Sequence, residues 1–265
     1  NQEGAYCERE EVRGWGILPD GRTPLTDKNG QGVAIGFNTG FYSDYAVVPS
    51  TAVAKIPKDV PFEIASLLGC AVVSGYGAIV NTAQVQVSQS TLIVGLGGVG
   101  LSAVMAAKLR GAYPIIGVDT NKERLELGKE IGCDQVMSAD DFNNIKITDF
   151  NGGFDVIIEA SGAVPAIEKC MSLLRRHGIC VYVGAAESTY ELKIPHLELV
   201  ATGKRLCGCL TGEVRPALDL SNLAGSIEKT NIHGLYNFET LMRDTQVDFF
   251  NAAFSNGLSF SFLNL

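Results

Sequence analysis

Between residue 91 and about residue 210, short runs of Val, Ile and Leu alternate with segments of helical composition. The runs lack the polar alternation of a half-exposed strand, which favours strands that are buried on both faces and joined by crossover helices. Strands are expected at 91–94, 114–118, 135–137, 155–158, 179–183 and 206–210, and helices at 99–110, 121–131 and 165–174. This order predicts an α/β fold with a doubly wound parallel sheet.

The residues on either side follow different patterns. Residues 1–32 are rich in turn-forming residues, and strand-like runs follow at 33–37 and 45–48. An apolar helical stretch is expected at 63–82. Its uncharged part, residues 64–80, is shorter than the ~20 residues that span a bilayer, so it favours a buried helix and no membrane partner. Beyond residue 211 the periodicity fades, and residues 244–265 hold five phenylalanines but no Lys or Arg.

Composition and charge exclude several classes of protein. With 46% hydrophobic and 19% charged residues, the chain is neither disordered nor fibrous. A net charge of −8 disfavours nucleic acid as a partner, because binders of duplexes present a basic face. The seven cysteines form no CxxC pair, and the first ten residues carry no signal-peptide pattern. Both observations favour reduced thiols and a cytoplasmic location.

The strongest chemical motif is the glycine-rich segment 95–100, which fits G-x-G-x-x-G. It follows an expected strand and opens an expected helix, which is the context of a dinucleotide-binding turn. The first glycine permits a tight turn, the second lets the backbone approach a pyrophosphate, and the last lets the helix pack close to the strand. The residues of this motif assigned to the phosphates are Gly95, Gly97, Gly98 and Gly100.

Asp119 ends the next expected strand, about twenty residues further on. A carboxylate at this position accepts hydrogen bonds from the hydroxyls of an adenosine ribose and repels a 2′-phosphate, so it favours NAD over NADP. The alternative is that Asp119 caps the following helix. Arg124, one helical turn into that helix, either flanks the ribose or is solvated.

Beyond this motif, the chain resembles the medium-chain, zinc-dependent alcohol dehydrogenases, and most closely their liver-type and glutathione-dependent formaldehyde dehydrogenase class. The resemblance covers about residues 1 to 212. It implies a Rossmann-type cofactor domain, NAD, a zinc ion, and a small alcohol or aldehyde as substrate. The motifs that carry it are 68–70, 74–77, 81–83, 95–104 and 118–122.

The resemblance also implies roles for individual residues. Cys70 matches a ligand of the catalytic zinc, and Cys7 matches the last cysteine of a structural zinc site. Ser74 falls where a hydroxyl contacts the nicotinamide side of the cofactor, and the strand at 206–210 resembles one that joins two cofactor domains into a homodimer. By the same resemblance, Val99 underlies the cofactor in the glycine-rich turn, and the backbone segment that meets the nicotinamide carboxamide is Val183, Gly184 and Ala185.

The chain departs from the family in its metal ligands. The family places the other ligands of both zinc ions ahead of the position that matches residue 1, so zinc is in doubt and no catalytic residue is assigned. The resemblance therefore implies three regions: 1–71 as the remnant of an incomplete GroES-like catalytic domain, 72–210 as the NAD-binding domain, and 211–265 as a divergent return to the catalytic domain.

Three functions remain open on these residues. The first is an NAD-dependent alcohol dehydrogenase-like oxidoreductase that is inactive as this chain alone. The second is a non-catalytic protein of the same descent that binds NAD or dimerises. The third is a zinc-free reductase, which Cys70 and Cys7 disfavour. For Cys70 itself two interpretations remain open: it is a zinc ligand, or it is a small buried core residue.

Overall fold

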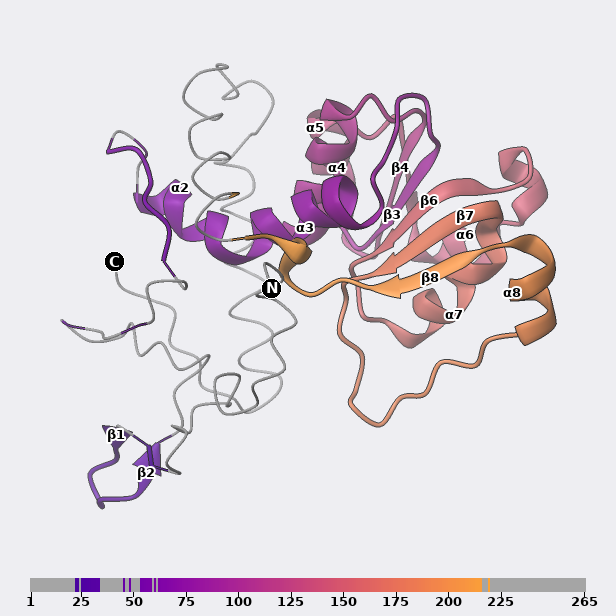
Figure 1. Cartoon of the computed structure of the whole chain (residues 1–265). Coiled ribbons are helices and arrows are strands. Elements are labelled where there is room, and N and C mark those ends of the chain that lie inside the picture. The colour runs from indigo at the N-terminus through magenta and orange to yellow at the C-terminus, as the bar shows by residue number, and fades with distance from the viewer. Residues whose placement is uncertain are drawn as a thin grey trace.

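Six parallel strands form the centre of the computed structural model, in the order β5-β4-β3-β6-β7-β8 (Figure 1). The structure describes residues 22–23, 25–33, 45, 48, 53–58, 60, 62–215 and 219. Strand β3, which comes first of these six along the chain, lies in the middle of the sheet, and the strand order reverses there. The predicted doubly wound, Rossmann-type sheet is therefore confirmed. The strands are β3 (Thr91–Val94), β4 (Ile115–Asp119), β5 (Gln135–Ser138), β6 (Phe154–Glu159), β7 (Leu174–Tyr182) and β8 (Arg205–Gly208).

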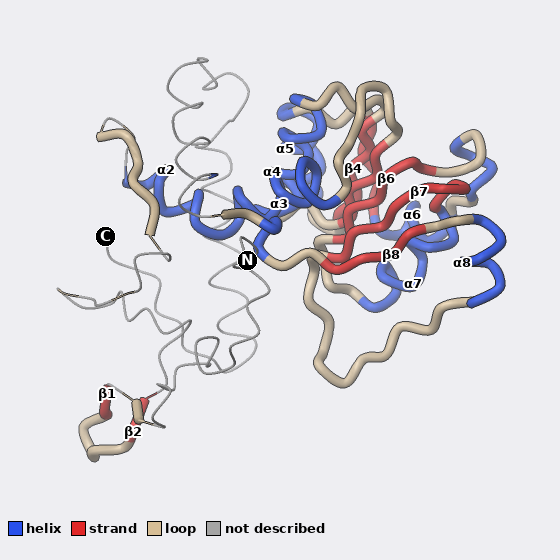
Figure 2. The backbone as a smooth tube through the Cα atoms, in the orientation of Figure 1, coloured by secondary structure: helices blue, strands red, loops and turns tan. Residues whose placement is uncertain are grey.

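Helices cover both faces of this sheet (Figure 2). Successive strand residues point to opposite faces, so Ile93 and Ile115 enter one core and Leu92 and Ile116 enter the other. The first core includes residues of α4 (Gly98–Leu109) and α5 (Lys122–Ile131), and the second includes residues of α6 (Ala139–Asn144) and α7 (Val164–Leu173). The expected helices are confirmed within a few residues of their ends.

The apolar stretch expected at 63–82 is one run of helix with two π-helical segments. It comprises α2 (Phe62–Leu67), η4 (Leu68–Val72), α3 (Val73–Gly77) and η5 (Ala78–Thr82). Within it, Ala65–Thr82 is long and apolar enough to cross a membrane, but half of this window is buried inside the protein. At Gly75 a Cβ atom would lie 2.7 Å from the Ala103 nitrogen of α4, so α3 packs directly on α4. This packing accounts for its apolar composition.

Several elements differ from the sequence prediction. Strand β7 follows α7 without a loop and begins five residues before the strand expected at 179–183, so His177 lies within the strand, at a φ of 61°. Helix α8 (His196–Thr202), the hairpin β1 (Leu25–Thr26) and β2 (Gly32–Val33), and the short turns η6 (Ile147–Phe150) and η7 (Thr211–Glu213) were not predicted. The run expected at 33–37 and the segment 244–265 lie almost wholly outside the described residues, as does most of 45–48.

Candidate functional site

The predicted cofactor residues meet at the carboxyl edge of the sheet. The register pairs Val94 with Val118 and with Glu159, and Glu159 with Tyr182, so β3, β4, β6 and β7 end side by side. Ligands of open parallel sheets bind outside these carboxyl ends, at the point where the strand order reverses. In this sheet that point lies between β3 and β6, directly next to the glycine-rich turn.

The glycine-rich turn is held tightly by its own backbone. Gly95 has a φ of 92°, and its N–H donates to the Val118 carbonyl at 2.8 Å. A Cβ atom at Gly95 would lie 2.8 Å from the Ser161 nitrogen, and one at Gly100 would overlap the carbonyl oxygen of Gly95. Gly97 is the N-cap of α4, and no side chain among the described residues caps this helix. The first N–H groups of α4 therefore remain available to an anion.

Asp119 joins this turn to the end of β4. Its Oδ2 accepts a 2.7 Å hydrogen bond from the Leu96 N–H, its Oδ1 accepts one of 2.8 Å from the Asn121 N–H, and Arg124 lies 4.0 Å from Oδ2. The helix-cap alternative for Asp119 is wrong, because Asn121 caps α5 by accepting from the N–H groups of Glu123 and Arg124. Each carboxylate oxygen keeps a lone pair with which it could accept a hydrogen bond from a ribose hydroxyl.

The residues expected at the nicotinamide end lie on the other side of the turn. The N–H groups of Val183 and Gly184 donate to the Glu159 carbonyl at 2.8 and 2.9 Å. Ala185 follows them, and Ser74 is buried on α3, whose next residue packs against the start of α4. The structure thus brings the predicted cofactor set to one edge of the sheet.

Sequence reasoning missed Glu159, the last residue of β6. Its side chain is fully buried, and its Oε1 accepts from the N–H groups of Ser161 and Gly162 at 2.9 and 3.0 Å and from the Ser161 hydroxyl. Its Oε2 is the only buried side-chain polar atom without a partner among the described residues. Burial raises the pKa of Glu159 above its ordinary value, although these hydrogen bonds act in the opposite direction. A carboxylate that directly follows the buried apolar run 156–158 of β6 was the available signal.

Replacing Glu159 with Gln should change how stability depends on pH. Because its pKa is raised in the folded state, its proton stabilises the fold below the unfolded pKa, and that stabilisation is lost as the pH rises through the folded pKa. Urea denaturation between about pH 4.5 and pH 8 should show the wild-type protein losing stability relative to Glu159→Gln, by about 1.4 kcal/mol for each unit of pKa shift. Parallel pH profiles of the two proteins would contradict this.

The described residues do not form a zinc site. Cys70 is exposed on η4, and within the described ranges no three His, Cys, Asp or Glu side chains are placed to hold a metal ion. Cys7 lies outside those ranges. Cys133, Cys170 and Cys180 are buried, as expected of core residues, and burial, reinforced by Asp134, raises the pKa of Cys133 to about 12. Cys133 is therefore a neutral packing group.

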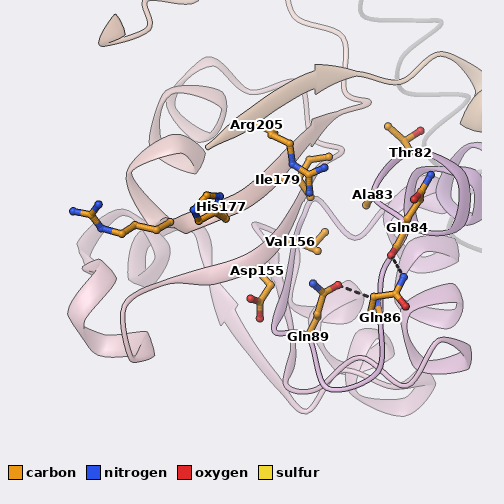
Figure 3. A pocket seen from close by; sticks show the side chains of 11 residues that line it. Thr82, Ala83, Gln84, Gln86, Gln89, Asp155, Val156, His177, Ile179 and Arg205 are labelled. Carbon is orange, nitrogen blue, oxygen red and sulfur yellow. Dashed lines mark hydrogen bonds between the residues drawn. The ribbon is translucent and has the colours of Figure 1, made fainter. Parts of the chain in front are cut away.

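A hollow of about 400 Å³ lies at the opposite, amino edge of the sheet (Figure 3). Figure 3 shows Arg205 and Ile179 on the strands, facing the glutamines of the segment after η5. None of the predicted cofactor residues lines this hollow. The rule for open parallel sheets favours the carboxyl edge, so we assign the candidate site there.

Comparison with known proteins agrees with this arrangement. Residues 98–224 match the zinc-binding dehydrogenase family. Over 217 residues the chain is 32% identical to alcohol dehydrogenase 6 of Peromyscus maniculatus. The matched region covers 80% of this chain and 57% of that protein. The chain therefore spans little more than half the length of this relative.

Two solved structures extend the similarity over nearly the whole chain. An alcohol dehydrogenase zinc-binding domain protein of Burkholderia ambifaria has a TM-score of 0.81 and 27% identity, covering 97% of this chain and 70% of that one. Benzyl alcohol dehydrogenase of Acinetobacter calcoaceticus has a TM-score of 0.76 and 26% identity, covering 96% and 69%. Together with this fold and this glycine-rich turn, these similarities support a place for the chain in the medium-chain alcohol dehydrogenase family.

Proposed function

We propose that residues 72–210 form the NAD-binding domain of an alcohol dehydrogenase-like oxidoreductase. The observation that carries this proposal is the bonding of Asp119: its carboxylate holds the glycine-rich turn through Leu96 and lies at the edge of the sheet where a ribose would bind. When bound, the nicotinamide ring would exchange a hydride with a small alcohol or aldehyde.

The chain's own residues would position that cofactor. The N–H groups at the start of α4 would receive the pyrophosphate, and the Asp119 carboxylate would accept both hydroxyls of the adenosine ribose. The backbone of 183–185 would meet the carboxamide, with Ser74 on the facing helix. The described residues do not supply a zinc site, so we derive no catalytic step through a metal.

A non-catalytic NAD-binding or dimerising protein of the same family is the second candidate. The observation that favours it is an apolar surface on α8 and just after β8, where Leu197 is 79% exposed and Val200 is 65% exposed. Since β8 is the edge strand of the sheet, a second copy of the chain could pair there. We propose a cytoplasmic homodimer under either function.

Replacing Asp119 with Ser tests the cofactor preference. The wild-type protein should bind NAD more tightly than NADP, because the carboxylate accepts the ribose hydroxyls and repels a 2′-phosphate. A charge-assisted hydrogen bond contributes about 1.5–3 kcal/mol, so the ratio of the two dissociation constants should shift by about tenfold or more in Asp119→Ser. Isothermal titration calorimetry with both dinucleotides measures this ratio.

Asp134 offers a matched control at the other end of β4. Its Oδ2 accepts a 2.7 Å hydrogen bond from the Ile115 N–H, so Asp134→Ser removes the same charge and the same type of backbone contact. That variant should keep the wild-type preference. Equal affinity of the wild-type protein for NAD and NADP would refute the assignment of Asp119.

A further inference from the structure

The Glu159 side chain lies where two loops of the candidate site meet. Its Oε1 holds the loop after β6 through Ser161 and Gly162, while its backbone carbonyl holds the loop after β7 through Val183 and Gly184. The two loops are in direct contact: a Cβ atom at Gly162 would overlap the carbonyl oxygen of Ala185. A single residue therefore organises the edge of the sheet that we assign to the nicotinamide end.

The free oxygen of Glu159 is directed toward that same edge. A Cβ atom at Gly184 would lie only 2.7 Å from Oε2, so this atom lies beside the backbone of the segment 183–185. Leaving a buried polar group without a hydrogen-bond partner is energetically unfavourable, and most such groups in proteins have a partner. The protein retains this cost at the one place in the described structure where the cofactor's ring is expected, which points to a ligand as the missing partner.

Among the residues that the structure describes, the groups packed around Glu159 carry no compensating positive charge. Cys170 on α7 and Tyr182 on β7 are the titratable groups that interact with it electrostatically, and Cys180 on β7 lies with them in the same core. A hydrogen bond with Cys180 and burial raise the pKa of Cys170, and burial raises the pKa of Tyr182, so both groups are neutral near pH 7. No ion pair joins Glu159 to a cation within the described part of the chain.

We propose that Glu159 is a positioning residue for the oxidised nicotinamide ring, an inference that rests on the proposed function. Burial raises the pKa of its carboxyl group in the empty site, and the cationic ring bound beside 183–185 lowers that pKa, so that binding releases a proton from the carboxyl group to solvent. The resulting carboxylate then stabilises the ring's positive charge. The reduced ring is neutral and offers no such partner, so the proton stays on Glu159 when reduced cofactor binds.

This coupling has a defined sign. An opposite charge within about 4–6 Å lowers the pKa of a carboxyl group by about 1–3 units. Binding of NAD⁺ then releases a proton, so its affinity should rise with pH over the range in which the empty protein is still protonated at Glu159. The affinities for NADH and for ADP-ribose, which lacks the nicotinamide ring, should not follow this profile.

Calorimetry on the full chain tests the proposal, with a chelator present so that no metal-bound water contributes protons. Dissociation constants for NAD⁺, NADH and ADP-ribose would be measured between about pH 5 and pH 8 for wild type, Glu159→Gln and Glu130→Gln. Glu130 is exposed on α5, so its variant removes the same charge away from the site. Glu159→Gln should raise the dissociation constant for NAD⁺ by about tenfold near pH 8. It should change the dissociation constants for NADH and ADP-ribose by less than about twofold. Glu130→Gln should match wild type.

A second measurement needs no variant and keeps the proposal falsifiable if Glu159→Gln fails to fold. Titrating wild type with NAD⁺ in two buffers of different ionisation enthalpy should reveal proton release, which titration with ADP-ribose should not. Equal weakening of all three ligands, or no proton release with NAD⁺, would overturn the role of Glu159 and leave the dinucleotide site intact. If wild type binds none of the ligands, the proposed function itself fails.

Discussion

Replacing Gly100 with Ala should abolish dinucleotide binding, with a loss of affinity of at least about 100-fold, or about 2.7 kcal/mol. The added Cβ atom would overlap the Gly95 carbonyl oxygen and would lie 2.8 Å from its carbon. Both are backbone atoms of the same turn, so α4 must move away from β3 and its N-terminal N–H groups leave the phosphate position. Overpacking of this kind also costs about 1–3 kcal/mol of unfolding free energy. Calorimetry with NAD and urea denaturation measure the two effects.

Gly69 provides the matched control for this substitution. It lies in a helical segment, and a Cβ atom there would meet nothing within 4 Å. Gly69→Ala should keep the cofactor affinity and should not lower stability, because Ala is favoured over Gly in helices. Wild-type affinity in Gly100→Ala would show that the glycine-rich turn is not the pyrophosphate site.

The 265-residue chain on its own should bind NAD and yet fail to oxidise alcohols. In this family a zinc ion polarises the alcohol and lowers its pKa, and the described residues place Cys70 on the surface without partner ligands. A single thiolate cannot hold zinc, because affinity comes from several ligands that converge on a preformed site. Turnover of short alcohols should therefore lie at least ~10⁴-fold below the ~10 s⁻¹ typical of enzymes. NADH absorbance and elemental analysis of the purified chain check both points.

Joining to the chain a segment that carries the family's other Cys and His ligands is the complementary experiment. It should restore zinc binding and turnover together, and replacing Cys70 with Ser should then abolish both. Cys207, which packs against the core at β8, is a control thiol whose replacement by Ser should leave zinc content unchanged. Stoichiometric zinc and ordinary turnover in the chain alone would show that it supplies ligands beyond the described residues.

The central sheet was predictable because its strands are buried on both faces. Runs such as Thr91–Val94 contain only residues that suit such a strand, and glycines or prolines mark the ends of the helices between them. That the residues assigned to the cofactor lie close together was also predictable, because a parallel sheet places the carboxyl ends of neighbouring strands side by side. Local sequence was enough where burial and turn chemistry agreed.

The rest depended on contacts between distant parts of the chain. Asn121 and not Asp119 caps α5, because the Leu96 N–H already engages the Asp119 carboxylate. Glu159 was missed because its importance comes from two loops that pack against it, which no local pattern encodes. The start of β7 was predicted five residues too late, because the strand begins directly after α7 with no turn residue between them.

The double role of Asp119 has a consequence for cofactor engineering. A redesign toward NADP would replace this carboxylate with a smaller or basic side chain to admit the 2′-phosphate. The same change would remove the acceptor of the Leu96 N–H, which is in the middle of the glycine-rich turn. Specificity and the shape of the phosphate cradle are thus not independent variables in this protein. A useful NADP variant needs a second substitution that returns an acceptor to Leu96, and single replacements should trade selectivity for affinity toward both cofactors.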